Sequence, residues 1–507
     1  MATPSAFTDV LVVGAGPSGL MAALCLARLG VDVTVVDGKG EPTRESRALA
    51  IQARSMEIFD QIGLVDRVLA ECGRAPQIVP GYRARAFRPV SFAGFGRTLT
   101  PYPGIHMLEQ STTERILHEA YRDSDTGRDV LWRHELRDLH IDGGDEEADH
   151  PVEAVLTTPA ATVTIRARWC IGADGASSTV RDRLGIDFEG STNPLRFYVA
   201  DALGVTGLVE KSVNMRVSRD DFVLGFPMGA AGHHRILGTV DEHEAEHGLE
   251  AGVRARLEAQ FAIRYNESTW FSNYRVHHRV AERFRRGPVF LVGDAAHVHS
   301  PVGAQGMNTG LQDAHNLACK LMDVIAGRRA AATLERYEAE RRPVARRLVR
   351  STDTIFARIT SRTRAARFAR DRVIPFLGPL AVRLVPGLVD TERLYGYLAQ
   401  LRIHYWMSPE ARTRRRDRVV GRRLAWSGDN YEALRALSWQ VHGYGVAAGT
   451  VIATASALGF DAHAFGPDRH RRLDTRLLYL VRPDGFVAAA ATPREALERF
   501  RSFVGSA

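Results

Sequence analysis

The sequence predicts an α/β fold with more than one domain, and three observations support this prediction. The chain has 507 residues, which is too long for one ordinary hydrophobic core. Its first forty residues read as a strand, a tight turn, a helix and a second strand. Another apolar strand, Val289 to Val292, stops at Gly293-Asp294 before a glycine-rich loop and a long helical pattern. Strands that enter helices through glycine turns are typical of a Rossmann-like parallel sheet.

The first strand, helix and strand carry the spacing of a dinucleotide site. Gly14, Gly16 and Gly19 stand at G-x-G-x-x-G positions between the strand and the helix, and Asp37 ends the next strand. The glycines permit a tight turn and a close approach of the backbone to a pyrophosphate, and Asp37 can accept a hydrogen bond from a ribose hydroxyl. The sequence therefore predicts dinucleotide binding rather than a purely structural glycine turn.

The middle of the chain predicts a sheet inserted into this fold. From Asp187 to Arg285 the pattern alternates between short strands, with one helix near Leu249 to Phe261. The stretch from Arg286 to Leu321 then returns the chain to the dinucleotide fold, and helices are expected from Leu311 to about Leu401.

Charge and composition fit a globular protein, with 45% hydrophobic residues and a net charge of +8. Eleven arginines and two acidic residues lie between Arg341 and Arg372, and a second basic run extends from Arg412 to Arg423. No aromatic platform accompanies these runs, so we interpret them as solvated arginine-rich segments and expect no nucleic-acid partner.

The cysteines and the N-terminal apolar run both argue for a cytoplasmic protein. The four cysteines form no CxxC pair, so neither a disulfide framework nor a metal site is predicted: Cys25, Cys72, Cys170 and Cys319. The uncharged run from Val10 to Ala27 contains three glycines and a proline, and no basic segment precedes it. We therefore expect no signal peptide and no membrane partner.

Three motifs in order carry a resemblance to a known family. They are "GAGPSGL", "GADGASSTVRDRLG" and "GDAAHVHSPVGAQGMNTGLQDAHNLACKL". In this order and spacing they resemble the class A flavoprotein monooxygenases, the superfamily of p-hydroxybenzoate hydroxylase and phenol hydroxylase. The stretches "LERYEAERRPVA" and "LLYLVRPDGFVAAA" are similar to the branch with a thioredoxin-like C-terminal domain, which includes phenol-type and aromatic-polyketide hydroxylases.

The resemblance implies a tightly but non-covalently bound FAD. Gly14, Gly16 and Gly19 would hold its pyrophosphate and Asp37 its adenosine ribose, although a glutamate is more usual at that position. The other implied contacts are Arg47, Gln110, Asp174 near the pyrophosphate, Asp294 on the ribitol chain, and Pro301, Gly303, Gly306, Met307 and Asn308 around the flavin ring.

The helix start at Gly306 to Asn308 has a physical purpose in this interpretation. Its backbone N–H groups would face flavin N1 and O2, where the reduced ring is anionic, and a helix N-terminus carries about half a positive charge. The alternative for Met307 is ordinary core packing.

The resemblance also implies three domains. The FAD-binding domain would comprise residues 1–80, 104–186 and 285–405, and the substrate-binding sheet domain residues 81–103 and 187–284. Residues 415–507 would form the thioredoxin-like domain, which cannot perform dithiol chemistry because it contains no cysteine. A glycine pattern at Gly443 to Ala448, followed by Arg469, Arg471 and Arg472, leaves an NADPH site there as an alternative.

The implied activity is hydroxylation of a phenolic or polycyclic, polyketide-like aromatic ring by a flavin C4a-hydroperoxide formed with NAD(P)H and O2. The sequence does not distinguish NADH from NADPH, and a homodimer is an open expectation. No catalytic base is assigned, because many side chains are candidates: His106, Tyr198, Arg216, Phe226, Tyr274, His277, His297 and His299. The alternatives are a Baeyer–Villiger or epoxidising monooxygenase and a non-catalytic relative that binds a hydrophobic ligand.

Overall fold

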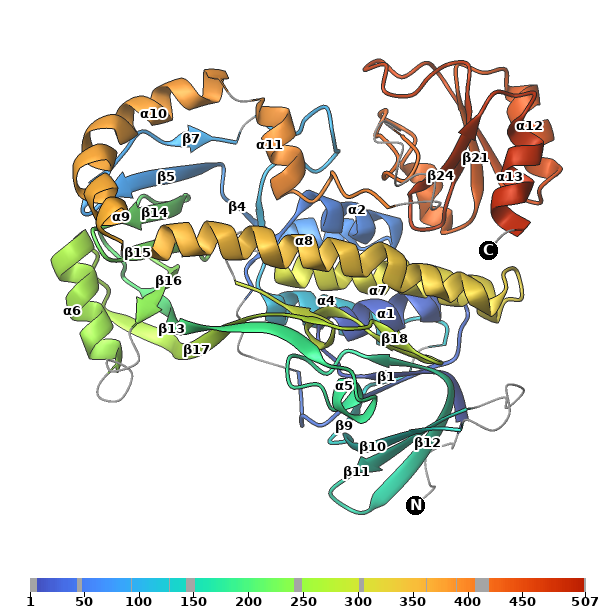
Figure 1. Cartoon of the computed structure of the whole chain (residues 1–507), viewed down its shortest axis with the longest axis horizontal. Helices are drawn as coiled ribbons and strands as arrows, with labels where there is room; N and C mark the ends of the chain where they lie inside the picture. The colour runs from blue at the N-terminus through green and yellow to red at the C-terminus, as the bar shows by residue number, and fades with distance from the viewer. Residues whose placement is uncertain are drawn as a thin grey trace.

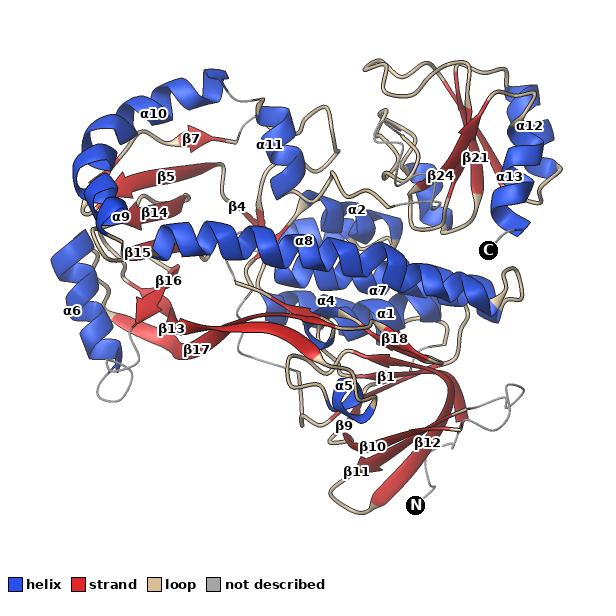
Figure 2. Ribbon diagram, viewed as in Figure 1, coloured by secondary structure: helices blue, strands red, loops and turns tan. Residues whose placement is uncertain are grey.

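The computed structural model describes residues 7–42, 48–92, 94–126, 128–142, 151–240, 249–300, 305–361, 363–388, 390–405 and 419–505. It has two large sheets, with helices between and around them, and a small domain at the C-terminal end (Figure 1, Figure 2). The long helix α8 (Glu335–Thr360) crosses the middle of the molecule between the second sheet and the C-terminal domain (Figure 1).

The first sheet has eight strands and a parallel centre. β2 (Val33–Asp37), β1 (Phe7–Val13), β12 (Thr162–Gly172) and β19 (Val289–Leu291) lie side by side and run parallel. Residues 10–13 are buried, as expected for a parallel strand with both faces covered. The other strands of this sheet are β9 (Leu131–Trp132), β10 (Glu135–Ile141), β11 (Val152–Thr157) and β18 (Arg285–Arg286).

Helices cover this sheet, and α1 (Pro17–Arg28) packs against both α4 (Gln110–Arg122) and α7 (Gly306–Ile325). This layer places the starts of α1 and α7 at the carboxyl ends of the parallel strands, which is where ligands bind in open α/β sheets. The smaller elements of this region are α2 (Ala53–Gln61), α3 (Val65–Glu71), α5 (Thr179–Arg183), η2 (Gly293–Ala295), η3 (Ala331–Leu334) and the sheet of β3 (Ala50–Ile51), β8 (His106–Met107) and β4 (Gly73–Arg74).

The second sheet has nine strands and is mainly antiparallel. Its order is β20 (His297–Val298), β17 (Glu267–Ala281), β13 (Phe188–Leu203), β16 (His234–Val240), β15 (Phe222–Pro227), β14 (Val213–Val217), β5 (Gln77–Tyr82) and β6 (Arg85–Ala86), with β7 (Val90–Ser91) also on β5. Helix α6 (Leu249–Phe261) packs on one face through Val253, Leu257 and Phe261. The other face packs against the region of the first sheet, where Phe226 and Met228 contact Leu49 and Met107.

Between α8 and residue 405, the described part of the chain contains the helical segments α9 (Arg364–Phe368), η4 (Ala369–Val373), α10 (Ile374–Leu388) and α11 (Thr391–Leu398). α10 lies beside β5 and β7 at the edge of the second sheet (Figure 1). The helical region predicted from Leu311 to about Leu401 therefore agrees with the structure.

The C-terminal domain has the strand arrangement of a thioredoxin-like fold. β21 (Gln440–Tyr444) and β22 (Asp461–Phe465) are parallel and joined by α12 (Ala448–Ser456). β23 (Leu478–Val481) and β24 (Val487–Ala491) extend the sheet antiparallel, and α13 (Ala496–Gly505) follows, with η6 (Glu432–Ala436) before β21.

This arrangement accounts for the glycine pattern of that domain. A β-carbon at Gly445 would lie 3.1 Å from side-chain atoms of Pro467 and Thr475, so the turn is packed by its own domain. Arg472 donates to the carbonyl oxygens of Thr98 (2.6 Å) and Trp426. These contacts are structural, and none of them supports the NADPH alternative.

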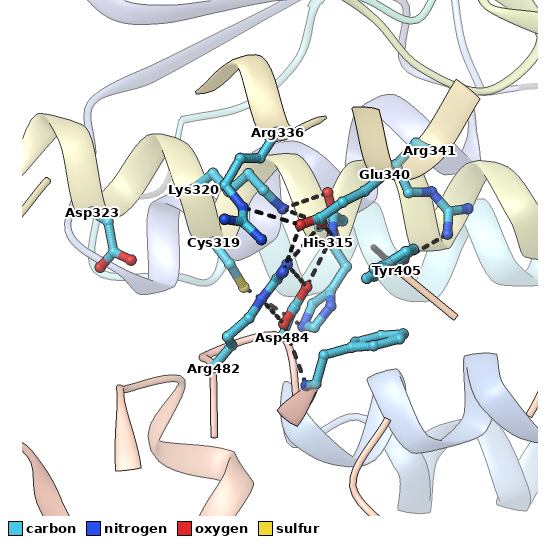
Figure 3. A network of polar contacts seen from close by, with 12 residues as sticks. His315, Cys319, Lys320, Asp323, Arg336, Glu340, Arg341, Tyr405, Arg482 and Asp484 are labelled. Carbon is cyan, nitrogen blue, oxygen red and sulfur yellow. Dashed lines mark hydrogen bonds and ion pairs between the residues drawn. The ribbon is translucent and has the colours of Figure 1, made fainter. Parts of the chain in front are cut away.

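A buried network of charges joins the C-terminal domain to α7 and α8 (Figure 3). Arg482 donates to both Oε1 (2.6 Å) and Oε2 (2.9 Å) of Glu340, and to Oδ2 of Asp484 (2.6 Å). Lys320 Nζ donates to Glu340 Oε2 (2.8 Å), and Asn316 donates to both carboxylates. Burial lowers the pKa of Lys320 to about 8. The C-terminal domain is thus fastened to the helix that begins at the predicted flavin loop.

The four cysteines have no disulfide partner. Burial raises the pKa of Cys25 and Cys72 to about 12, and it raises the pKa of Cys170 and Cys319 as well. Within the described residues, none of the helices combines the length and the apolar character needed to cross a membrane.

Candidate functional site

The glycine turn between β1 and α1 separates two roles. A β-carbon on Gly14 would overlap the Ala173 carbonyl group, and one on Gly19 would overlap the Gly14 carbonyl oxygen. These two glycines therefore allow β1, α1 and the loop after β12 to approach closely. A β-carbon on Gly16 would meet no atom within 4 Å, so the space beside the start of α1 is open.

Asp37 lies at the end of β2, next to this turn. Its carboxylate accepts hydrogen bonds from the backbone N–H groups of Ala15 (2.8 Å, Oδ2) and Lys39 (2.8 Å, Oδ1). A carboxylate has about four acceptor positions, so two remain after these bonds. The side chain is held in place by the turn and can still accept from ribose hydroxyls.

Asp174 lies in the loop after β12. Ser178 Oγ donates to its Oδ1 (2.6 Å) and the Val180 N–H group to its Oδ2 (3.0 Å), and burial raises the pKa of Asp174. The carboxylate therefore binds the start of α5. This loop also supplies the Ala173 carbonyl group that contacts Gly14.

The loop after β19 meets α1 and α7 at a crowded crossing. Gly293 has φ +58°, and a β-carbon on Gly310 would lie 3.1 Å from the Gly293 α-carbon and closer still to Ser18 Oγ. Sequence reasoning missed Gly310. It follows Gly306 by four residues, and glycines at this spacing in a helix are typical of close helix packing. Asp294 is exposed between buried neighbours.

Helix α7 begins at Gly306, and its first backbone N–H groups donate no hydrogen bond to the side chain of the N-cap residue. Gln305 makes no side-chain cap hydrogen bond, and the first turn contains no acidic residue. Asn308 accepts from the Gln52 N–H group (2.7 Å) and donates to the Ala50 carbonyl oxygen (2.8 Å), which fixes α7 to β3 and α2. Met307 is half-buried and packs against the main hydrophobic core.

Gln110 is the first residue of α4. Its backbone N–H donates to the Ala48 carbonyl oxygen (3.1 Å), and its side chain donates to Glu114 (2.9 Å). Three other predicted contacts lie outside the described residues: Arg47, Pro301 and Gly303.

A buried charge network holds the first half of α7 in place. Asp313 Oδ2 lies 2.7 Å from His297 Nε2, and Arg341 Nε donates to Asp313 Oδ1 (2.6 Å). Arg341 also donates to the Tyr405 hydroxyl (2.8 Å) and the Thr309 carbonyl oxygen (3.2 Å). Burial alone would raise the pKa of Asp313, but Arg341 and His297 hold it below its usual value. Sequence reasoning listed His297 but missed Asp313 and Arg341, which are 28 residues apart.

His299 is a neutral imidazole beside the start of α7. Burial, with His297 nearby, lowers its pKa to about 4. Its Nδ1 lies 2.7 Å from the Ser300 carbonyl oxygen, an acceptor, so Nδ1 carries the proton. Its Nε2 is buried and has no hydrogen-bond partner among the residues that the structure describes, and a β-carbon on Gly306 would lie 3.6 Å from it. A hydrogen-bond acceptor therefore points toward the first residue of α7.

The comparisons with known proteins identify this arrangement. Residues 7–352 match the model of the family described as "FAD binding domain". The chain belongs to this FAD-binding family. It is a FAD-dependent monooxygenase of the aromatic hydroxylase group, as its relatives show.

Two curated relatives and one solved structure illustrate the match. The 6-methylpretetramide 4-monooxygenase of Streptomyces rimosus is 37% identical over 409 residues, covering 79% of this chain and 70% of that protein. The 12-dehydrotetracycline 5-monooxygenase/anhydrotetracycline 6-monooxygenase of Streptomyces rimosus subsp. rimosus is 31% identical over 513 residues, covering 96% and 95%. The structure of the anhydrotetracycline hydroxylase OxyS from Streptomyces rimosus superposes with a TM-score of 0.77 at 28% identity, covering 98% and 99%.

The residues of this flavoenzyme fit FAD on three structural grounds. The space beside Gly16 is open at the start of α1, where a helix N-terminus favours a pyrophosphate. Asp294 is exposed at the end of a parallel strand. The first turn of α7 contains no acidic residue, so its backbone N–H groups suit the anionic edge of a reduced flavin ring.

The inner face of the second sheet lies toward the FAD-binding part of the flavoenzyme. Phe226 and Met228 pack with Leu49 and Met107 from that part. Strand register places Leu224 and Met215 directly opposite each other on the same face, where both are partly exposed. Farther along this face, Phe197 stacks on Tyr274 with ring centroids 5.9 Å apart.

Register separates the remaining candidate side chains. Arg216 and Tyr198 share the opposite face, which α6 covers, because both align across the strands with Val223 and Gly238. His277 Nδ1 lies 2.9 Å from Thr192 Oγ1. His106 is buried in β8, where burial and Arg74 lower its pKa to about 4. Of the histidines proposed from sequence, His299 is the one whose open acceptor faces the start of α7.

Proposed function

We propose that this flavoenzyme hydroxylates a phenolic or polycyclic, polyketide-like aromatic substrate with NAD(P)H and O2. One observation carries the proposal: the start of α7 and the open acceptor of His299 lie at the end of a sheet whose inner face is apolar and aromatic. The names of the two Streptomyces rimosus relatives, which refer to tetracycline-type compounds, support a polycyclic substrate.

FAD would be held by groups at the carboxyl ends of β1, β2 and β19. Gly16 and the start of α1 would receive the pyrophosphate, Asp37 the ribose and Asp294 the ribitol chain, while the N–H groups of residues 306–308 would bind the pyrimidine edge of the ring. When bound, FAD supplies two-electron transfer from NAD(P)H and the activation of O2.

His299 would orient the substrate through a hydrogen bond and would not act as the base that takes up its proton. A phenol has a pKa near that of tyrosine, about 10, whereas the pKa of His299 is about 4. Its Nε2 can therefore accept a hydrogen bond from a phenolic O–H group, but it cannot keep the proton at neutral pH. The inner face of the sheet, from Leu224 to Phe226, would hold the apolar part of the ring system and exclude water.

The test of this function is a substrate panel under turnover. Purified enzyme with FAD bound should consume NADH or NADPH faster in the presence of one class of phenols or polycyclic quinones. The product should gain one oxygen atom on an aromatic carbon, the oxygen should come from O2, and little hydrogen peroxide should be released.

Two other outcomes would assign a different function. A ring-expanded ester or an epoxide as the product would establish the Baeyer–Villiger or epoxidising alternative, which the same site serves. A protein that binds the aromatic compound but oxidises no NAD(P)H after reconstitution with FAD would establish the non-catalytic alternative.

A further inference from the structure

The outer side of α9, η4 and α10 carries several strongly exposed apolar side chains, here called the α10 face. Phe376, Leu380 and Leu384 follow one another at intervals of four on one side of α10, and Phe368 and the charged Arg372 precede them at the same interval. Its large apolar members are strongly exposed: Phe368 (65%), Val373 (39%), Phe376 (74%), Leu377 (56%), Leu380 (51%) and Leu384 (52%). Single exposed apolar residues are ordinary, but several together mark an interaction site.

The inner side of the same segment is anchored. A β-carbon on Gly378 would lie 2.7 Å from the Phe87 ring, so α10 lies tightly on the loop after β6. Asp371 accepts from the Tyr82 hydroxyl (2.7 Å), and Arg370 donates to the Arg219 carbonyl oxygen (2.8 Å). Because these contacts fix the inner side of the helix, the apolar residues of the α10 face point outward. They are not core residues exposed by a misplaced helix.

Among the charged residues from 364 to 384 that the structure describes, those without an ion-pair partner are all arginines. Arg364, Arg372 and Arg383 are exposed, and none has an acidic partner among the residues that the structure describes. Asp371, the acidic residue between them, is turned inward to Tyr82. Arg364 and Arg372 belong to the basic run between Arg341 and Arg372, and the proposed hydroxylation does not involve them.

These two properties together select the partner. In a twofold pair of this chain, the α10 face would meet its own copy and bring the same arginines together, which repel one another. An anionic lipid surface offers acyl chains to the apolar row and phosphate groups to the arginines, as in-plane amphipathic helices require. We propose that the α10 face docks the enzyme reversibly on an anionic lipid surface.

This docking is peripheral and agrees with the finding that no described helix can cross a membrane. It departs from the sequence-based expectation of no membrane partner, which rested on the absence of a spanning or signal segment. An outward apolar row on α10 becomes recognisable only when the contacts of its inner side are known.

The test is flotation of the purified FAD-loaded enzyme with phosphatidylcholine vesicles, with and without phosphatidylglycerol. We expect binding to the phosphatidylglycerol vesicles at low salt and its loss at high salt. The triple variant F376S/L380S/L384S should reduce the bound fraction roughly tenfold. The pair R372Q/R383Q should remove the preference for the anionic vesicles.

Ile452→Ser is the matched control, because Ile452 is 54% exposed on α12, away from the α10 face. It should leave vesicle binding unchanged, and FAD content should be the same in all variants. Absence of flotation at low salt would overturn the proposal. So would a dimer, measured by light scattering, that the triple variant converts to a monomer, because the α10 face would then serve a second copy.

Discussion

Among the glycines of the first turn, Gly16 and Gly19 have opposite surroundings. Gly19 has no room for a side chain because the Gly14 carbonyl group lies against it, whereas Gly16 faces open space. The same motif therefore contains one glycine that the fold requires and one that the ligand would require. The two can be separated by experiment.

Gly16→Ala should keep the apoprotein folded and weaken FAD binding by at least about tenfold, because the new methyl group would occupy space near the pyrophosphate. Gly19→Ala should instead destabilise the apoprotein by about 1–3 kcal/mol through overpacking. Fluorescence titration with FAD and urea unfolding of the apoproteins measure the two effects.

Gly252→Ala is the control, because a β-carbon there would meet no atom within 4 Å and the residue lies in α6. It should change neither FAD affinity nor stability unfavourably. If Gly16→Ala bound FAD as tightly as the natural protein, the pyrophosphate would not lie beside Gly16.

The free energy of unfolding at acidic pH should depend on His299. Its pKa is about 4 in the folded protein and 6.5 in a model compound, so between these values the unfolded chain binds a proton that the folded chain does not. Its contribution to stability is therefore complete above about pH 6.5 and is lost as the pH falls toward 4. His299→Asn removes this contribution.

Between pH 7 and pH 5 the natural apoprotein should lose roughly 2 kcal/mol more unfolding free energy than the His299→Asn variant. Urea unfolding at the two pH values provides the measurement. Other buried histidines, such as His106 and His315, are common to both proteins and cancel in the difference. Parallel losses in the two proteins would show that His299 is not buried in its neutral form.

At the scale of the element, α7 is held at two points along its length by buried charges. Asp313, near its start, binds His297 and Arg341, while Lys320, farther along, binds Glu340. The first network positions the start of α7, where the flavin ring is proposed to bind, and the second joins α7 to α8. A helix fixed in this way presents its N-terminus, to which Gln305 gives no side-chain cap, in one orientation.

Asp313→Asn should destabilise the enzyme by about 3–5 kcal/mol, because Arg341 would remain buried without its carboxylate. Urea unfolding of the FAD-free protein measures this loss directly. Glu153→Gln breaks the more exposed ion pair with Arg166 and should cost at most about 1 kcal/mol. Similar losses in both variants would contradict the assignment of Asp313 as the buried anchor.

At the scale of the whole molecule, the C-terminal domain depends on Arg482. This arginine is buried between Glu340 of α8 and Asp484 of its own domain (Figure 3). Trp439 adds a hydrogen bond from its indole N–H group to Asp323 of α7 (2.7 Å). The domain is therefore expected to unfold together with the rest of the enzyme.

Arg482→Met should divide thermal unfolding into two steps, because Glu340 and Asp484 would lose their shared cation. Differential scanning calorimetry would then show an early transition of the C-terminal domain, predicted to comprise residues 415–507. Arg476→Gln removes a surface ion pair with Asp474 and should leave the single transition unchanged. A single transition in Arg482→Met would contradict the role of this arginine.

The sequence predicted the parts of the molecule that depend on neighbouring residues. The turn at Gly14 to Gly19, the strand end at Asp294 and the inserted sheet each follow from a local pattern. The domain limits and the FAD contacts stay predictions. Asp313 with Arg341, and Glu340 with Arg482, escaped prediction because their separation of 28 and 142 residues leaves no local pattern.

Asp174 illustrates the other limit. The motif around it is easily recognised, but its carboxylate is occupied by Ser178 and Val180, which spacing alone does not indicate. The face of a strand is similarly hidden: Arg216 and Tyr198 are plausible site residues until the register places them under α6. Tertiary contacts decide such questions, and a short motif does not contain them.

The chemical state of the cysteines makes the protein suitable for site-specific labelling. Cys25, Cys170 and Cys319 are buried, and Cys72, which is half-buried, has a pKa of about 12. Maleimides and similar reagents react with thiolates, so all four native thiols should react slowly at neutral pH. A single cysteine introduced on an exposed surface would then carry a fluorophore or spin label without removal of any native thiol.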